Sequence, residues 1–72
     1  MSARWDFTAA GWGQHAHPFP SGQETRWTGH GPRRGYIAAG DTLITDAGAW
    51  RVVEVRYMRD PPDQWFATLE RA

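Results

Sequence analysis

Two histidines stand two residues apart in this 72-residue sequence, at His15 and His17. In an extended segment this spacing places both imidazoles on the same side of the chain, and zinc and iron sites use imidazoles as ligands. His30 is the candidate third ligand, and Glu24 or an aspartate is the candidate fourth. The alternative is that all three histidines are solvated loop residues or cap the backbone. The pattern therefore leaves a metal site as one of several functional hypotheses.

A second segment, from Arg26 to Tyr36, interleaves arginines with aromatic rings over flexible glycines. Proteins that bind single-stranded nucleic acid stack bases on such rings and bind phosphates with guanidinium groups. The candidate nucleic-acid-binding residues are Arg26, Trp27, Arg33, Arg34 and Tyr36. The alternative is a solvated turn in which Trp27 is buried in the core. The formal net charge of zero argues against a nucleic-acid partner, because phosphate binding normally needs a basic excess.

The stretch before this segment combines an isolated tryptophan with a proline pair. Trp12 lies between two glycines, and Pro18-Phe19-Pro20 is expected to be stiff and extended. Tryptophan is strongly enriched at the energetic centres of protein interfaces, and extended proline-containing segments dock in grooves. We therefore predict a partner-binding surface formed by Trp12, Pro18, Phe19 and Pro20. The alternative for Trp12 is that it folds back over the domain as a lid.

The residues that could carry catalysis do not form a recognisable set. Ser2 and Ser21 have no paired histidine and acid at positions typical of a triad, and the aspartates fall at turns. The glycine-rich stretch 29–35 lacks the Lys-Ser/Thr ending of a phosphate-binding loop. We therefore expect a protein that is not an enzyme and that holds no cofactor.

Length and charge limit the organisation of the chain. Seventy-two residues suffice for one small domain, because typical domains have about 100–150 residues. Residues 1–35 carry four Arg against one Asp and one Glu, whereas 36–72 carry four Arg against four Asp and two Glu. There is no run of 18 apolar residues and no apolar signal segment at the start, so we expect a cytoplasmic protein without a membrane partner.

The composition is unusual in two respects. All eight basic residues are Arg, which together with abundant Ala, Gly and Pro is typical of GC-rich bacterial or phage coding sequences. Leu, Ile, Val and Phe number only 10, whereas there are five Trp and no Cys. Because each aromatic side chain buries about 150–250 Å², we predict a core built from tryptophans.

The strands that must position these residues follow from alternation and turn signals. Residues 36–69 predict a meander of three antiparallel strands. In the segment 50–58, Val53, Val55 and Tyr57 are expected on one face, and the other face carries Trp50, Val52 and Met58. The segment is therefore apolar on both faces at one end, which indicates a bend. Trp65, Ala67 and Leu69 are expected to share one face of the last strand. Two further strands are expected upstream, and 9–23 is expected to be a long loop. The expected strands are 4–8, 24–28, 42–45, 50–58 and 65–69.

The run from Gly40 to Ile44, followed by Gly48 and the aromatic-led segment 50–55, resembles the opening hairpin of SH3-like small barrels, including KOW and Tudor-type modules. The resemblance covers about half of the chain and implies a small barrel associated with binding of RNA, ribosomal or polymerase components, or peptide tails. The basic excess of KOW modules is missing, and no aromatic cage of Tudor type can be assigned residue by residue.

Together these observations predict an all-β fold: one domain over 1–72, a small SH3-like barrel of about five short antiparallel strands with a long Gly/Pro/His-rich loop. The favoured function is a non-catalytic module that binds a protein partner, as an adaptor or an inhibitor. The alternatives are a barrel that binds single-stranded RNA or DNA and a histidine-based metal-binding protein. Steep salt dependence would favour nucleic acid, and a zinc-induced rise in melting temperature would favour the metal.

Overall fold

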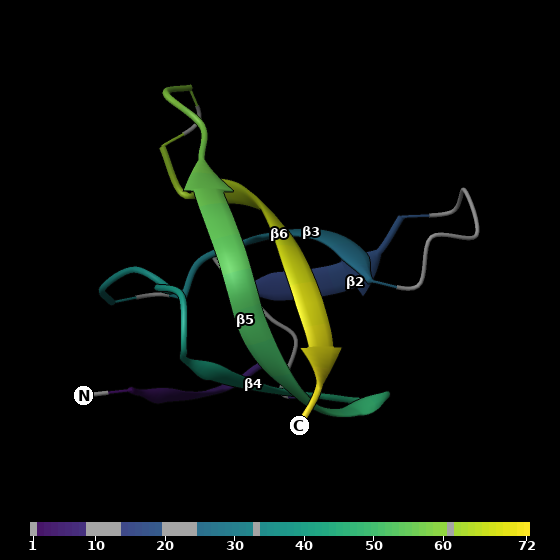
Figure 1. Cartoon of the computed structure of the whole chain (residues 1–72). Coiled ribbons are helices and arrows are strands. Elements are labelled where there is room, and N and C mark those ends of the chain that lie inside the picture. The colour runs from purple at the N-terminus through teal and green to yellow at the C-terminus, as the bar shows by residue number, and fades with distance from the viewer. Residues whose placement is uncertain (1, 9–13, 20–24, 33, 61) are drawn as a thin grey trace.

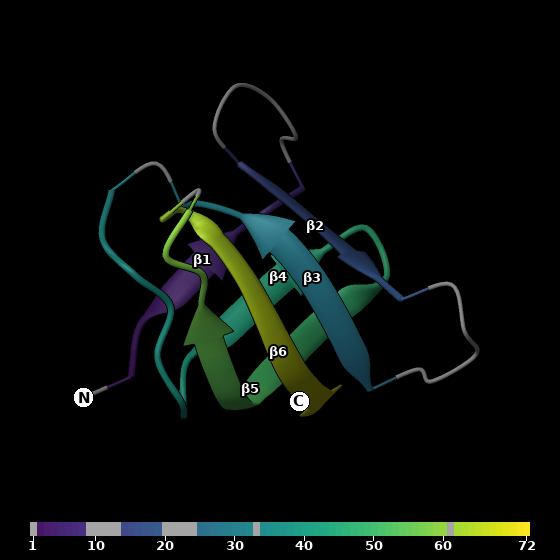
Figure 2. The ribbon, with the colours of Figure 1, turned by 90° about the horizontal axis from the view of Figure 1, so that it is seen from above.

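A computed structural model describes residues 2–8, 14–19, 25–32, 34–60 and 62–72 of the chain (Figure 1). This part of the chain contains strands and no helix, so the predicted all-β class is confirmed. The strands are β1 (Arg4–Asp6), β2 (His15–Pro18), β3 (Arg26–His30), β4 (Thr42–Thr45), β5 (Gly48–Tyr57) and β6 (Gln64–Arg71). They form one sheet in the order β1-β4-β5-β6-β3-β2, which curls into a half-barrel (Figure 2).

The predicted three-stranded meander is confirmed. Strands β4, β5 and β6 pair antiparallel in sequence order, with Leu43 opposite Trp50 and Val55 opposite Ala67. Gly48 begins β5 with a φ of 107°, a conformation that glycine adopts without steric cost. Because consecutive strands joined by short turns pair readily, this part of the sheet follows from local sequence patterns.

A β-bulge bends β5 at the position where the sequence predicts a bend. The register shifts between Val52 and Glu54, so Val53 is an extra residue in β5 and is 49% exposed. Before the bulge Val52 faces the core, and after it Val55 and Tyr57 pack against the core instead. The expectation that Val53 shares a face with Val55 and Tyr57 is therefore wrong, because one inserted residue reverses the alternation.

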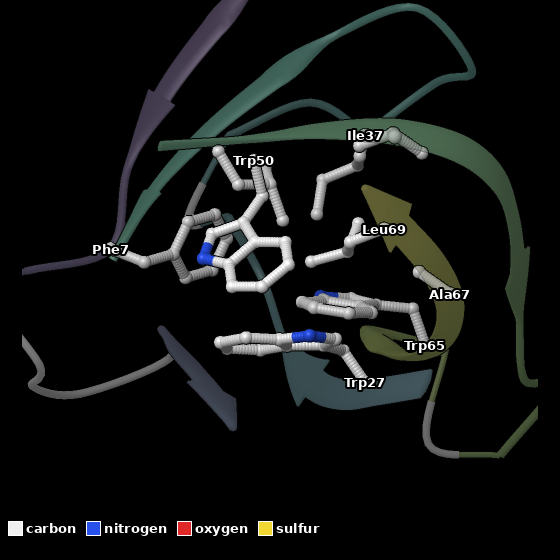
Figure 3. Close-up of a cluster of buried hydrophobic side chains, with 9 residues drawn as sticks. Phe7, Trp27, Ile37, Trp50, Trp65, Ala67 and Leu69 are labelled. Carbon is white, nitrogen blue, oxygen red and sulfur yellow. The ribbon is translucent and has the colours of Figure 1, made fainter. Parts of the chain in front are cut away.

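Tryptophans form the centre of the core, as predicted. Trp65 is fully buried, and the rings of Trp27 and Trp50 lie 5.3 Å apart between their centroids (Figure 3). Phe7 meets Trp65 edge to face at 6.1 Å. The other buried apolar residues are Ile37, Leu43, Val52, Ala67 and Leu69. Large aromatic surfaces thus compensate for the small number of aliphatic side chains.

The first strand differs from the prediction in its direction. Strand β1 pairs with β4 in parallel, with Trp5 opposite Leu43, so the expectation of purely antiparallel pairing is wrong. The Phe7 N–H continues the ladder by donating to the Ile44 carbonyl at 2.7 Å. The chain between β1 and β4 supplies the long connection that a parallel pair requires, and alternation within a strand does not specify its direction.

The expected long loop over 9–23 also needs correction. Residues His15–Pro18 form the edge strand β2, which pairs antiparallel with β3 and places Ala16 opposite Gly29. A Cβ atom at Gly29 would collide with the His15 carbonyl oxygen and come within 2.7 Å of the Trp65 ring. The absence of a side chain at Gly29 therefore lets β2 lie close over the core.

No helix in the part of the chain described here has the length and apolarity to cross a membrane.

Candidate partner-binding surface

The predicted partner-binding residues are only partly visible in the fold. Pro18 ends β2, and Phe19 follows it with its N–H donating to the Arg26 carbonyl at 2.9 Å. Trp12 and Pro20 lie outside the described residues. The Phe19 ring meets Phe66 edge to face, with centroids 5.8 Å apart and planes at 76°. Phe19 is thereby positioned over the face of the sheet that points away from the tryptophan core.

Strand alternation explains why this outer face carries a large apolar ring. Trp65, Ala67 and Leu69 of β6 point into the core, so Phe66 and Thr68 point to the opposite side. Phe66 is flanked by Thr28 of β3 and Arg56 of β5, which are its cross-strand partners. Arg26 and Glu54 flank Thr68 in the same way. The resulting row of side chains runs across three strands.

A hollow of about 580 Å³ lies over this row. It is lined by Phe19, Arg26, Trp27, Glu54, Val55, Arg56, Phe66, Ala67 and Thr68. The two phenylalanines supply apolar surface, and the hydroxyl of Thr68 and the charged groups supply polar surface. Apolar surface with a few polar groups around it is typical of binding sites of this size.

The charges around the hollow are free to meet a partner. The guanidinium groups of Arg26 and Arg56 and the carboxylate of Glu54 are solvent-exposed. The arginine–carboxylate ion pair found among the described residues lies elsewhere, between Arg51 and Glu70 at 2.6 Å, and the His30 Nδ1 lies 3.8 Å from an Asp63 carboxylate oxygen. Two arginines against one glutamate leave a net positive charge at the rim of the hollow.

The predicted nucleic-acid residues are not brought together on one surface. Trp27 is buried in the core with 3% of its surface exposed, as in the alternative interpretation, so its ring does not present a face to solvent. Arg26 belongs to the outer hollow, whereas Tyr36 packs edge to face on Tyr57 at a separate hollow of about 180 Å³. Arg34 is exposed, and Arg33 lies outside the described residues.

The predicted histidines, by contrast, are adjacent. The Nδ1 atoms of His15 and His17 lie 3.0 Å apart, and His30 is the cross-strand partner of His15. Burial lowers the pKa of His17, and the charges of His15 and His30 lower it further. Within the described ranges, however, no three His, Asp or Glu side chains are grouped so that they could hold a metal ion.

Sequence reasoning missed a buried carboxylate that accepts several hydrogen bonds. The sequence places Asp41 in an ordinary turn, but Asp41 is buried and its carboxylate accepts three hydrogen bonds of 2.9 Å each, from the Ala3 N–H, the Trp5 indole N–H and the Ala38 N–H. Burial alone would raise the pKa of Asp41, but these hydrogen bonds outweigh it and hold the pKa below its ordinary value. The Gly40-Asp41 pair signals a turn, and nothing local indicates the bonds to β1.

Phe66, Arg56 and Glu54 were also missed as components of a surface. The available signal was Phe66 itself, a large apolar residue on the polar side of a strand whose other face is filled by Trp65, Ala67 and Leu69.

No family model, no curated protein and no solved structure matches this chain. The geometry of the site is therefore what indicates a function for this chain.

Proposed function

We propose that this chain is a non-catalytic binding module whose outer hollow docks a segment of a protein partner. The observation that supports this proposal is the Phe19–Phe66 ring pair, which lines the same hollow as two exposed arginines that form no ion pair with a described residue. The SH3-like character of the barrel and the participation of Trp12 and Pro20 belong to the same proposal.

The chemistry of the hollow defines the partner segment. An aromatic or branched apolar side chain of the partner would cover the rings of Phe19 and Phe66 and remove them from water. A neighbouring carboxylate of the partner would meet Arg26 or Arg56, whose planar guanidinium groups bind carboxylates bidentately. Arginine and large aromatic residues are the types that contribute most to binding energy at protein interfaces. The proposed ligand is therefore a short apolar segment flanked by acidic residues.

Selection from a displayed library of short random peptides tests the proposal and needs no candidate partner. We expect the selected peptides to share an apolar residue next to Asp or Glu. The affinity of a selected peptide should fall about tenfold or more, equivalent to about 1.4 kcal/mol, in the Phe66→Ala variant and in the double variant Arg26→Glu/Arg56→Glu. The control is Arg59→Ala, which removes an exposed arginine away from the hollow and should leave the affinity unchanged.

Two results would contradict the proposal. One is that the selected peptides show no common pattern, or bind the hollow variants as tightly as the unmodified protein. The other is that single-stranded RNA or DNA binds with a steep salt dependence and depends on Arg26, because that result would assign the surface to nucleic acid. Circular dichroism of each variant establishes that the fold is retained, so loss of binding can be attributed to the hollow.

A further inference from the structure

The two histidines of β2 are held on the same side of the strand by the packing of the residue between them. Ala16 is partly buried against the core, so His15 and His17 point to the solvent side of this edge strand. Their rings lie 4.5 Å apart between centroids, with planes inclined at 59°. The pair is a consequence of the strand that the sequence did not predict, because a flexible loop would not keep the two imidazoles together.

The separation between the two ring nitrogens matches that of two ligands on one metal ion. Imidazole nitrogens bind zinc at about 2.0–2.1 Å, which places two such nitrogens about 2.9 Å apart at a right angle and about 3.4 Å apart at the tetrahedral angle. The Nδ1 atoms of His15 and His17 are 3.0 Å apart. In the metal-free protein one of these nitrogens carries the proton that the other accepts. For both Nδ1 atoms to bind a metal ion, the donor ring must move its proton to Nε2 by exchange with water, so that each Nδ1 presents a lone pair.

We propose that His15 and His17 form an open, solvent-exposed chelate for a borderline divalent transition-metal ion of the Zn²⁺, Ni²⁺ or Cu²⁺ type. Imidazole is a preferred ligand for these ions, whereas Mg²⁺ and Ca²⁺ prefer oxygen. Water fills the remaining coordination positions, since the described residues offer no group of three ligands. This site is independent of the proposed partner-binding hollow, which shares none of its residues.

A metal ion requires unprotonated imidazole nitrogens, so protons and the metal ion compete for both rings of the pair. His30 lies across from His15, but its Nδ1 is 3.8 Å from an Asp63 carboxylate oxygen. We therefore do not count His30 as a ligand of the chelate. Binding both ligands on one strand also favours the extended conformation of β2.

Calorimetric titration of the protein with ZnCl₂ and with NiCl₂ tests this assignment, using tag-free protein so that no added histidines compete. We expect saturable binding of one ion per chain at neutral pH, and weaker binding at acidic pH where protons compete for the nitrogens. His15→Ala and His17→Ala should each weaken the affinity about tenfold or more, which corresponds to losing about 1.4 kcal/mol of binding free energy. The matched control His30→Ala removes one imidazole of the same cluster and should leave the affinity within about twofold.

Nuclear magnetic resonance of the imidazole nitrogens provides a second readout that does not depend on the variants folding alike. Addition of Zn²⁺ to the unmodified protein should shift the ring signals of His15 and His17 and leave those of His30 nearly unchanged. Absence of saturable binding would overturn the proposal. An equal loss of affinity in all three variants, or an equal shift of all three rings, would overturn the assignment to the His15–His17 pair.

Discussion

The meander of β4, β5 and β6 and the strands β1, β2 and β3 build one core by different means. The meander contains six of the seven Leu, Ile and Val residues of the chain, the seventh being Ile37, and short turns connect its strands. Residues 1–35 contain no Leu, Ile or Val, and their strands join the sheet through Trp and Phe rings, a close approach at Gly29 and hydrogen bonds to Asp41. The pairing of β4, β5 and β6 is therefore specified by local sequence patterns, whereas β1, β2 and β3 need the rest of the fold.

The largest effect is expected where the two regions meet. Trp65 lies in the meander but packs against Phe7 and close to Gly29. Trp65→Ala should cost about 3–5 kcal/mol, through lost burial and a cavity, which approaches the whole stability of so small a domain. Urea unfolding followed by circular dichroism should show little folded protein. The control Val53→Ala, at the exposed bulge residue, should change stability by less than about 0.5 kcal/mol.

A smaller change should separate the two regions. Gly29→Ala puts a methyl group against the His15 carbonyl and the Trp65 ring, and overpacking of this kind typically costs about 1–3 kcal/mol. We expect amide hydrogen exchange to accelerate in β2 and β3 while the β4–β5 amides stay protected. Gly48→Ala is the contrast, because its Cβ meets nothing closer than 3.9 Å and the cost comes only from the positive φ. Equal protection of β2 in both variants would show that Gly29 does not control the docking of that strand.

The attachment of β1 should depend on pH through Asp41. Because hydrogen bonds lower the pKa of the folded carboxyl, its contribution to stability is present above the unfolded value of 3.8 and is lost as the pH falls through the folded value. Asp41→Asn leaves one acceptor oxygen for three donors and should cost about 1–2 kcal/mol at neutral pH. Urea midpoints measured from pH 7 to pH 3 should fall less steeply in this variant than in the unmodified protein.

Asp6→Asn is the matched control for that experiment. Hydrogen bonds from the Thr8 side chain and backbone lower the pKa of Asp6 as well, but its carboxylate is exposed and ties together only neighbouring residues. Substitution of Asp6 should leave most of the fall in the urea midpoint between pH 7 and pH 3 unchanged. Identical pH profiles for Asp41→Asn and the unmodified protein would contradict the role assigned to Asp41.

The smallest effect is expected at the shortest ion pair. Arg51 donates to Glu70 across β5 and β6 at 2.6 Å, but both side chains are about half exposed. Water and salt screen such a pair, so Arg51→Ala should cost about 0.5 kcal/mol or less. A thermal melt in low and moderate salt measures this difference. A loss of stability comparable to that of Asp41→Asn would show that this ion pair stabilises the meander more than an exposed, screened pair should.

The difference between the regions also explains what could be predicted. The strands 42–45 and 65–69, the inward face of Trp65, Ala67 and Leu69, and the bend in β5 all follow from alternation and turn residues. Strand β2 did not follow, because the His-Ala-His-Pro sequence has little intrinsic strand preference and pairs only because Gly29 lets it approach. The candidate site was half predicted: Phe19 was named from its own segment, whereas Phe66 and Arg56 come from strands distant in sequence.

Local patterns in the amino-acid sequence are sufficient to predict the all-β class, the meander and the tryptophan core, because period-two alternation and turn chemistry act between near neighbours. The parallel pairing of β1, the formation of β2 and the burial of Asp41 arise instead from tertiary contacts. Tertiary contacts also bring the side chains of the outer hollow together and hold His15 beside His17. These features depend on contacts between segments far apart along the chain. Such contacts stabilise a strand or a buried carboxylate only when the folded core holds the segments together.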